Sequence, residues 1–454
     1  MSKKRRLAMI LSTALILTVA ACGSPSNSNP NSNANSSSPA PASSEPSSEP
    51  SGEPEPSLQG ELVFWTMWND TEPQGEAWAD VAKAFEAKYP GTKITINWSG
   101  RDLSKTLKPA LESGQRIDIF DYPTQYGGQL GSYALDLSDI IAQPFDVLGG
   151  KSLTDVLLPS MLETPKKQTD IWDGQVAVGY KPWLNLFMYN VKAFEEAGIT
   201  SAPKTWQELD EASAKLKAAG YSPITFDDAY AHWISGTYLQ RLKGQDWVIE
   251  LAADTTGDKW RDPAVLEFAK AFEDFAKKGY FDANVGGNKW PSGQMDVGSG
   301  KVAMYFNLTG LPVEVKDVAG PDFKWGAFNY PDVTDGQNFA ANAAAAGATM
   351  TAINSKTENT ALAAEFLAFM HSAESDARFV EAGMTTSLKD GNWPAELADV
   401  KPVFDDINVI LQTGGGIESN PEIKPVFSEN FIKLAAGQIS AEEFVDNMAS
   451  AAKQ

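Results

Sequence analysis

Residues 176–190 read Val176-Ala-Val-Gly-Tyr-Lys-Pro-Trp-Leu-Asn-Leu-Phe-Met-Tyr-Asn190, a long extended run near the middle of a 454-residue chain. A helix is predicted directly after it, over Val191 to Ala197, with Gly198 as its C-terminal stop. Thr205 and Glu208 then have the spacing of a capping box that opens the next helix. The centre of the chain is therefore predicted to form a strand followed by two helices.

Upstream of this run, predicted strands and helices alternate. The strands are expected at residues 61–65, 93–98 and 117–120, and the helices at 78–89 and 103–113. This order predicts a parallel sheet that is covered by helices. Since ligands lie beyond the carboxyl ends of the strands in such sheets, the first loops to inspect follow Trp65 and Phe120.

The N-terminus resembles an export signal with a lipid attachment site. Basic residues at 3–6 precede an apolar stretch from Leu7 to Val19, which is shorter than the roughly 20 residues that span a bilayer. Residues 19–23 read Val-Ala-Ala-Cys-Gly and resemble the lipobox of bacterial lipoproteins, so residues 1–21 are expected to be a signal peptide and Cys22 to be lipidated. Cys22 is the only cysteine, which argues against a disulfide framework. An ordinary secretory signal with a chance cysteine is the alternative.

Residues 22–58 comprise the predicted lipidated cysteine and a tether of mostly Ser, Pro, Asn, Ala and Glu, with no aromatic residue. Such a composition cannot build a core and predicts disorder. A flexible chain of this length has a mean end-to-end distance of roughly 30–36 Å. The folded body is therefore expected to stay close to the membrane while tilting freely above it.

Length and charge restrict what the remaining body can be. The formal net charge is −22, and removal of the signal peptide with its four basic residues makes the chain still more acidic. Such a surface argues against nucleic acid or an anionic membrane face as a partner. The remaining residues exceed the size at which one hydrophobic core stops growing, so two lobes are expected.

Several motifs together resemble a known family. They are Met188-Tyr-Asn-x₃-Phe-x₂-Ala-Gly-Ile199, Pro203-x-Thr-Trp-x-Glu-Leu209, Gly300-Lys-Val-Ala-Met-Tyr-Phe-Asn307, and Ala363-Ala-Glu-Phe-Leu-Ala-Phe-Met370. In this order they resemble the sugar-type extracellular solute-binding proteins of ABC importers, the group to which maltose-binding protein belongs. The resemblance runs from Glu61 to about Met448.

The resemblance implies an α/β fold of the periplasmic-binding-protein type, with two lobes, mixed sheets flanked by helices, and a ligand cleft between the lobes. The N-terminal lobe would comprise residues 59–181 plus 348–388, and the C-terminal lobe residues 182–347 plus 389–454. Three hinge crossings are then expected, near 180–183, 343–347 and 387–390. The alanine run at the second crossing fits either a hinge or a tightly packed strand.

The implied function is capture of a carbohydrate, an oligosaccharide or glycan fragment, and its delivery to an ABC permease. The thirteen tryptophans suit a sugar cleft, because sugars bind through flat aromatic platforms beside planar polar groups. We expect a monomer without cofactor, metal or enzymatic activity. It would be held on the extracytoplasmic face of the cell membrane through lipid alone, most simply on a Gram-positive surface.

Candidate ligand contacts follow two of the N-terminal strands. After the first strand come Trp68, Asn69 and Asp70, and after the third come Asp121, Tyr122 and Gln125. Each group combines aromatic and planar polar side chains on a loop that is predicted to face the ligand. The alternatives are helix capping and a surface tryptophan for the first loop, and a turn stabilised by Asp and Pro for the second.

Further candidates lie in the expected C-terminal lobe. Trp183 and Asn185 share one face of the hinge strand, since strand residues two apart point the same way. Family contact positions match Asp228 and Tyr230, the patch continues with His232 and Trp233, and Asn307 ends another strand. The chain departs from many relatives at 308–311, where Leu-Thr-Gly-Leu replaces a turn with a tryptophan, which puts a maltodextrin-like ligand in doubt.

An enzyme is the main alternative. The acidic pairs at 227–228 and 405–406 could serve a surface glycosidase or polysaccharide lyase. Neighbouring strand residues point to opposite faces, however, and no hydrolase, metalloprotease or phosphate-binding motif is present. Residues 254–258 match no complete calcium loop and are interpreted as a turn. A receptor for a small peptide or a polyol is a third possibility.

Overall fold

The computed structural model describes residues 58–168, 174–333, 336, 342–406 and 409–453. The predicted signal peptide, Cys22 and all of the predicted tether except Leu58 lie outside the described residues. Residues 56–454 form one compact unit of the chain. Within its described part, no helix has the length and apolar character that a bilayer crossing requires. That part also contains no cluster of three or more His, Cys, Asp or Glu side chains suited to a metal ion.

Among the described residues, nine strands form one mixed hydrogen-bonded network, which confirms the predicted α/β fold with mixed sheets. Its main path runs β2 (Thr92–Trp98), β1 (Gly60–Thr66), β3 (Ile119–Pro123), β8 (Ala343–Ile353), β4 (Val178–Asn190), β6 (Val302–Leu308) and β5 (Ser222–Thr225). Two further strands, β7 (Trp325–Phe328) and β9 (Val409–Leu411), pair with β4 and β8. The β1–β2, β1–β3, β5–β6 and β8–β9 pairs are parallel and the others are antiparallel.

The first two N-terminal strands occur where the sequence predicts them, and β1 lies between β2 and β3 in parallel register. The third strand, β3, begins two residues later than predicted and extends to Pro123, so Asp121 and Tyr122 lie within the strand and not on the loop after it. The helix between β1 and β2, α1 (Pro73–Lys88), begins five residues before the predicted start at Trp78, because Pro73 at its first position is preorganised for a helix. The predicted capping box opens α8 (Trp206–Ala218) in a modified form. Thr205 Oγ1 accepts the Glu208 N–H, but Glu208 returns its hydrogen bond to the N–H of Lys204.

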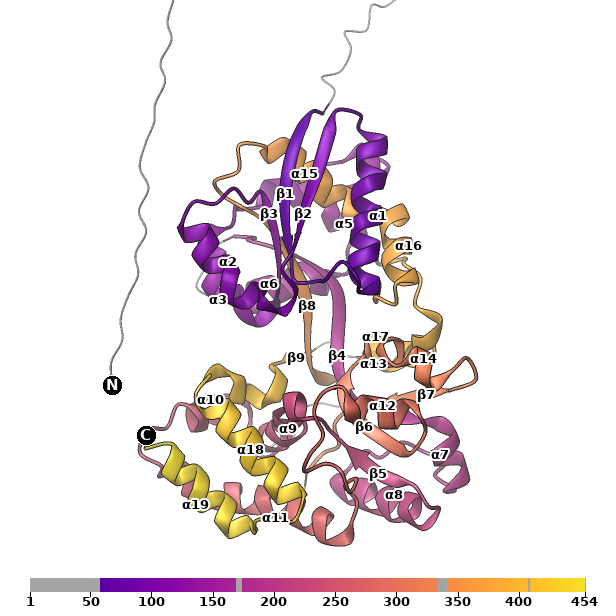
Figure 1. Cartoon of the computed structure of the whole chain (residues 1–454), viewed down its shortest axis with the longest axis vertical. Coiled ribbons are helices and arrows are strands. Elements are labelled where there is room, and N and C mark those ends of the chain that lie inside the picture. Colours follow the sequence, from indigo (N-terminus) through magenta and orange to yellow (C-terminus); the bar gives the residue numbers. More distant parts are fainter. Residues whose placement is uncertain (1–57, 169–173, 334–335, 337–341, 407–408, 454) are drawn as a thin grey trace, which may run out of the picture. The chain divides into compact units, whose positions relative to one another are not determined.

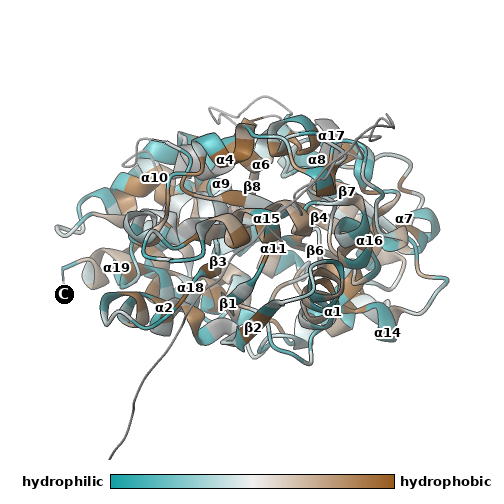
Figure 2. Ribbon diagram, turned by 90° about the horizontal axis from the view of Figure 1, so that it is seen from above, coloured by the Kyte–Doolittle hydropathy of each residue, from teal (hydrophilic) through white to brown (hydrophobic). Residues whose placement is uncertain are grey.

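Buried apolar side chains divide into two clusters. The first core draws on residues 62–180 and 348–384, and the second core on residues 184–346 and 397–452. Figure 2 shows hydrophobic residues on the strands and on the helix faces that pack against them. We call the parts of the molecule built on these cores the first half and the second half.

Helices cover the sheet in both halves (Figure 1). In the first half these are α1, α2 (Leu103–Glu112), α3 (Gly127–Leu130), α4 (Ser138–Ala142), α5 (Leu153–Val156), α6 (Pro159–Gln168), α15 (Thr360–Met370) and α16 (Ala373–Glu381). In the second half they are α7 (Val191–Glu196), α8, α9 (Ala231–Lys243), α10 (Gln245–Ala252), α11 (Pro263–Lys278), α12 (Ser292–Gly298), α13 (Leu311–Glu314), α14 (Lys316–Ala319), α17 (Lys401–Asp406), α18 (Ile423–Ala435) and α19 (Ala441–Ala451).

The strands β4 and β8 run from one half to the other, side by side (Figure 1). Tyr180 of β4 belongs to the first core and Leu184 to the second, whereas in β8 Ala346 belongs to the second core and Ala348 to the first. Every residue of β8 is buried, so its alanine run is a tightly packed strand. Along its length β8 pairs first with β9 at residues 343–345, then with β4 at 346–351 and with β3 at 349–353.

Lys181 interrupts the pairing of these two strands. The register shifts between Tyr180 and Pro182, and Lys181 adopts a left-handed backbone with φ 46°. A non-glycine residue in this region costs about 1–2 kcal/mol, which the surrounding pairs must offset. Opposite this bulge, Gly347 allows the Trp183 ring to lie against β8, because a Cβ at Gly347 would meet Trp183 Cζ2 at 2.2 Å.

A buried carboxylate joins β1, β3 and β4 in the first half. Asp121 is 0% exposed and accepts hydrogen bonds from Thr66 Oγ1, the Met67 N–H and the Tyr180 hydroxyl, each at 2.7 Å. These bonds fix the chain where it leaves β1 and where β4 approaches its bulge. Asp121 therefore organises the structure around the loop after β1.

We expect Asp121→Ala to lower the free energy of unfolding by about 3 kcal/mol or more, because it leaves two buried hydroxyl donors and one partly buried backbone donor without this acceptor. Urea unfolding of the mature body would measure the change. The matched control is Asp80→Ala, which removes a carboxylate that is 62% exposed and pairs with Lys83. That variant should stay within about 0.5 kcal/mol of the wild type, and equal effects of the two substitutions would contradict the assigned role.

Candidate functional site

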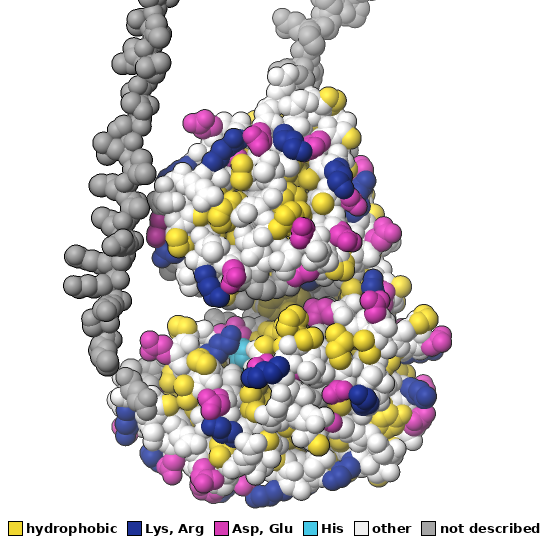
Figure 3. Space-filling view, in the orientation of Figure 1, with side chains coloured by type: hydrophobic (Ala, Val, Ile, Leu, Met, Phe, Trp, Pro, Cys, Tyr) yellow, Lys and Arg dark blue, Asp and Glu magenta, His cyan; other side chains and the backbone are white. Residues whose placement is uncertain are grey.

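A cavity of about 330 Å³ lies where the two halves meet, and side chains of both halves line it. The first half contributes the loop after β1, α2, the end of β3 and the segment up to α3. The second half contributes the 3₁₀ helix η5 (Asp228–Tyr230), the start of α9 and the 3₁₀ segment η8 (Thr413–Ser419). Figure 3 shows a hollow between the halves on the face in view. As expected from the sheet topology, the loops at the carboxyl ends of β1 and β3 reach this cavity.

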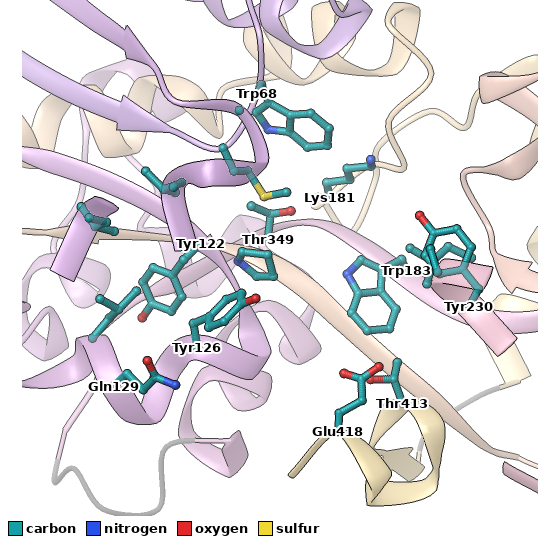
Figure 4. Close-up of a pocket in the computed structure, with 18 of the residues that line it drawn as sticks. Trp68, Tyr122, Tyr126, Gln129, Lys181, Trp183, Tyr230, Thr349, Thr413 and Glu418 are labelled. Carbon is teal, nitrogen blue, oxygen red and sulfur yellow. The ribbon is translucent and has the colours of Figure 1, made fainter. Parts of the chain in front are cut away.

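Two aromatic side chains offer partly exposed faces in the second half. Trp183 of β4 and Tyr230 of η5 both line the cavity and are half-buried. Tyr230 stacks on Trp233, with ring centroids 4.2 Å apart and an interplanar angle of 26°. Figure 4 shows Trp183 between Tyr230 and the Thr413–Glu418 side of the cavity. This arrangement presents flat apolar surfaces next to polar groups, as sugar binding requires.

The opposite wall is held in place by hydrogen bonds to buried groups. Trp68, which is buried, donates its Nε1–H to the Tyr180 hydroxyl at 2.9 Å, and Tyr180 in turn donates to Asp121. Lys181 Nζ lies 4.5 Å from the centre of the Trp68 ring, within range of a cation–π interaction. The side chain of Trp68 is thus held in place by Tyr180 and Lys181.

Glu418 is a charged group of the cavity that two neighbouring side chains hold in place. Its Oε1 lies 2.6 Å from His232 Nε2 and accepts the Trp233 Nε1–H at 2.7 Å. Burial alone would raise the pKa of Glu418, but the hydrogen bond and charge interaction with His232, the Lys424 ammonium and the Trp233 bond together lower it to about 2. Burial lowers the pKa of His232, so its ring is neutral at neutral pH and donates its Nε2–H to the carboxylate. The charge interaction with Glu418 acts only at lower pH, where the ring is protonated. The cavity therefore contains a carboxylate that is ionised at neutral pH.

A run of three glycines brings Glu418 to this position. Gly414, Gly415 and Gly416 all have positive φ, of 57°, 66° and 107°. The run packs directly on α9, because a Cβ at Gly415 would meet the Gly236 carbonyl oxygen at 2.1 Å. Only glycine permits both this backbone and this approach.

Six of the predicted site residues line the cavity: Trp68, Tyr122, Trp183, Tyr230, His232 and Trp233. Three predicted residues are engaged elsewhere. Asn69 is exposed and donates to Glu72, Asp121 is a buried structural carboxylate, and Asp228 binds Lys289 Nζ at 2.8 Å. Asp70 is exposed and is not among the lining residues, and the side chain of Gln125 lies outside the described part.

Asn185 and Asn307 are buried on the paired strands β4 and β6, next to lining residues Trp183 and Leu308. Neither lines the cavity itself. Both amide atoms of Asn185, and Nδ2 of Asn307, have no hydrogen-bond partner among the described residues. Because buried amides are normally hydrogen-bonded, water or a bound ligand is the natural partner for these groups.

Sequence reasoning missed several lining residues. The charged ones are Lys108, Lys181, Glu314, Glu418 and Lys424, and the others with polar groups include Tyr126, Gln129, Thr349 and Thr413. The glycine run before Glu418 was the available signal, since consecutive glycines mark a close backbone approach. The remaining residues come from helices and loops whose side-chain directions depend on tertiary packing.

Glu418 should make the stability of the protein depend on pH in a defined window. Its pKa of about 2 lies below the ordinary value of 4.5, so its stabilising contribution is present above about pH 4.5 and is lost as the pH falls toward 2. We expect Glu418→Gln to remove this component. The decline in unfolding free energy from about pH 5 to about pH 2 should be smaller in the variant by up to about 3 kcal/mol.

Urea unfolding at a series of pH values would measure this difference. The matched control is Glu429→Gln, which removes a carboxylate that is 68% exposed and pairs with Lys433 on the surface. It should follow the wild-type profile, since exposed ion pairs contribute little. A Glu418→Gln profile parallel to that of the wild type would refute the role assigned to this carboxylate.

Comparisons with known proteins agree with this geometry. The family model described as bacterial extracellular solute-binding protein matches residues 68–377. A binding protein of Brucella abortus is 25% identical over 272 residues, which are 57% of this chain and 60% of the relative. The sn-glycerol-3-phosphate-binding periplasmic protein of Brucella abortus is 32% identical over 139 residues, 28% of this chain and 29% of the relative. The alignment thus spans less than two thirds of these curated relatives.

Solved structures share the fold over most of the chain. A chitin oligosaccharide binding protein is 23% identical, with a TM-score of 0.65 over 87% of this chain and 98% of its own. A sugar transporter protein of Bacillus licheniformis in complex with stachyose is 17% identical, with a TM-score of 0.64 over 87% of this chain and 100% of its own. At these identities the structures establish the fold alone.

Proposed function

Because the chain belongs to the bacterial extracellular solute-binding proteins, we propose that it captures an oligosaccharide between its two halves and delivers it to the permease of an ABC importer. The observation that carries the carbohydrate assignment is the pair of partly exposed rings, Trp183 and Tyr230, beside the ionised Glu418 in one small cavity. Apolar ring faces would stack on the C–H faces of a sugar, and the carboxylate would accept hydrogen bonds from its hydroxyl groups. The sugars named for the solved structures of the same fold support this choice.

Capture would proceed by closure of two lobes around the ligand. A ligand that touches residues of both halves favours the closed state by its differential affinity for that state. The proposed lobes are residues 59–181 plus 348–388 and residues 182–347 plus 389–454, and the proposed hinges include the bulge at Lys181. Hinges concentrate a large dihedral change in a few residues, and this bulge already interrupts the strand pairing.

The lipobox-like residues before Cys22 support a lipid-anchored monomer on the outer face of the cell membrane, most simply of a Gram-positive cell. Tethering would hold the receptor near its permease at high effective concentration. We expect Cys22→Ser to release the protein from the cells that make it, because two or more acyl chains on this residue would be the anchor. Fractionation of cells and medium would measure the release, and a variant that stays in the membrane fraction would overturn the anchor assignment.

A phosphorylated polyol is a second candidate ligand. Lys108, Lys181 and Lys424 line the cavity, and one relative is named for sn-glycerol 3-phosphate. Two carboxylates, Glu314 and Glu418, line the same cavity and would repel a phosphate. With three lysines and two carboxylates the lining charges nearly cancel, so they select only weakly for an anion, and the exposed ring faces favour a sugar.

The mature body incubated with a panel of glycans should be stabilised by its ligand. At a hundredfold excess over Kd, the expected gain in unfolding free energy is about 2.7 kcal/mol, with no new reducing ends. Thermal unfolding and a reducing-end assay would measure both. Protection by sn-glycerol 3-phosphate but by no glycan would favour the polyol phosphate. Cleaved product would instead support the alternative, a surface glycosidase or lyase.

Within the same experiment, Trp183→Ala should weaken glycan binding about tenfold by removing a stacking surface. The control is Trp247→Ala on α10, because Trp247 is also partly exposed but does not line the cavity. Both variants lose an indole, so only a difference between them reports on the site. Equal affinities would show that Trp183 does not stack on the ligand.

A further inference from the structure

Trp290 is an exposed tryptophan of the second half that is not among the residues lining the cavity. At 50% exposed, it is the most exposed large hydrophobic side chain in the described part of the chain. It precedes α12 and is held at both ends: its backbone N–H donates to Asp228 Oδ1 at 3.1 Å, and its Nε1–H donates to the side-chain oxygen of Gln294. A ring with a satisfied polar edge, a fixed orientation and an open face loses little entropy when a ligand stacks on it.

Two connections join Trp290 to the wall of the cavity. Asp228, which holds its backbone, directly precedes the lining residues Ala229 and Tyr230. Gln294, which holds its ring, is buried and donates its Nε2–H to Glu314 Oε2 at 2.7 Å, and Glu314 lines the cavity. The exposed ring is therefore attached to the second-half wall from both sides.

The support beneath this ring is rigid. Asp227 Oδ1 accepts the Gly293 N–H at 2.7 Å, and Asp227 Oδ2 accepts the Tyr305 hydroxyl at 2.9 Å. Asp227 is 0% exposed and Tyr305 belongs to β6, so the start of α12 is fixed to the sheet of the second half. A flat surface that is positioned through buried hydrogen bonds differs from a tryptophan that is merely exposed at the tip of a loop.

The small size of the cavity suggests what the exposed ring of Trp290 could bind. Its volume of about 330 Å³ lies at the lower end of the roughly 300–1,000 Å³ found for ligand pockets. A short saccharide fills such a volume, and the remaining units of a longer chain must continue over the adjoining surface. On the second half, Trp290 is an exposed aromatic side chain that hydrogen bonds connect to this wall through Asp228 and Gln294.

We propose that Trp290 forms an outer subsite, a stacking platform for sugar units that extend beyond the cavity. The ligand is then a linear oligosaccharide longer than the cavity alone accommodates. This inference rests on the proposed carbohydrate function of the same site. Lys289, whose side chain is 80% exposed and whose Nζ is held by Asp228 at 2.8 Å, lies next in the chain and supplies a donor for sugar hydroxyl groups at the platform edge.

The test compares affinities across chain length. Calorimetric titration of the mature body would use linear xylo-, chito- and malto-oligosaccharides, from the disaccharide to the hexasaccharide. Wild-type affinity should rise with length in one series. We expect Trp290→Ala to leave disaccharide binding unchanged and to weaken binding of the long members about tenfold, which removes most of the gain with length.

Matched variants separate stacking from bulk apolar contact. Trp290→Phe should retain most of the gain because it keeps a flat ring, whereas Trp290→Leu should not. Val318→Ala, which trims another exposed apolar side chain of the second half, should bind all lengths like the wild type. Because the Trp290 ring is half exposed, these variants should keep the wild-type melting temperature to within a few degrees.

The outcomes distinguish the two proposals. If the wild type binds short glycans but Trp290→Ala changes no affinity, or changes all lengths equally, the outer subsite is wrong and the proposed function stands. The same holds if wild-type affinity does not rise with length. If the wild type binds no member of any series, the carbohydrate function is wrong and the subsite with it.

Discussion

The pairing of β4 with β8 is the constraint on which the rest of the molecule depends. These strands are the only elements of the described chain that contribute buried side chains to both cores, and their hydrogen bonds join the two halves into one sheet network. The register shift at Lys181 and the close approach of Trp183 to Gly347 both lie within this pairing. The cavity lies beside these features, so the same two strands set the distance between its walls.

The order of strands in the first half could be predicted from sequence because each strand is a short apolar run bounded by turn residues. The motifs around residues 188–209 and 300–307 were likewise specific enough to indicate the family, which the match over residues 68–377 confirms. Helix starts were less accurate, as the early beginning of α1 at Pro73 illustrates. Local patterns determine the type of an element better than its first residue.

Most of the predicted aromatic residues line the cavity, whereas most of the predicted polar residues do not. Trp68, Tyr122 and Trp183 follow or lie on strands whose ends face the cavity, so strand topology was sufficient to place them. Asp121 has the same position in sequence terms, yet its carboxylate turns inward to bind Thr66, Met67 and Tyr180. Glu418 could not be predicted as a partner of His232, because 186 residues separate them and only the tertiary fold brings them together.

The discontinuity of the two cores has a consequence for how the chain acquires its structure. The first core needs residues 348–384 and the second needs residues 397–452, so neither can be completed until nearly the whole chain has been synthesised. Contacts between distant segments form late because loop closure precedes any gain from them. A chain with this topology therefore stays incompletely folded through most of its synthesis. The discontinuous chain path that forms the cavity between the two halves thus also delays completion of the native fold.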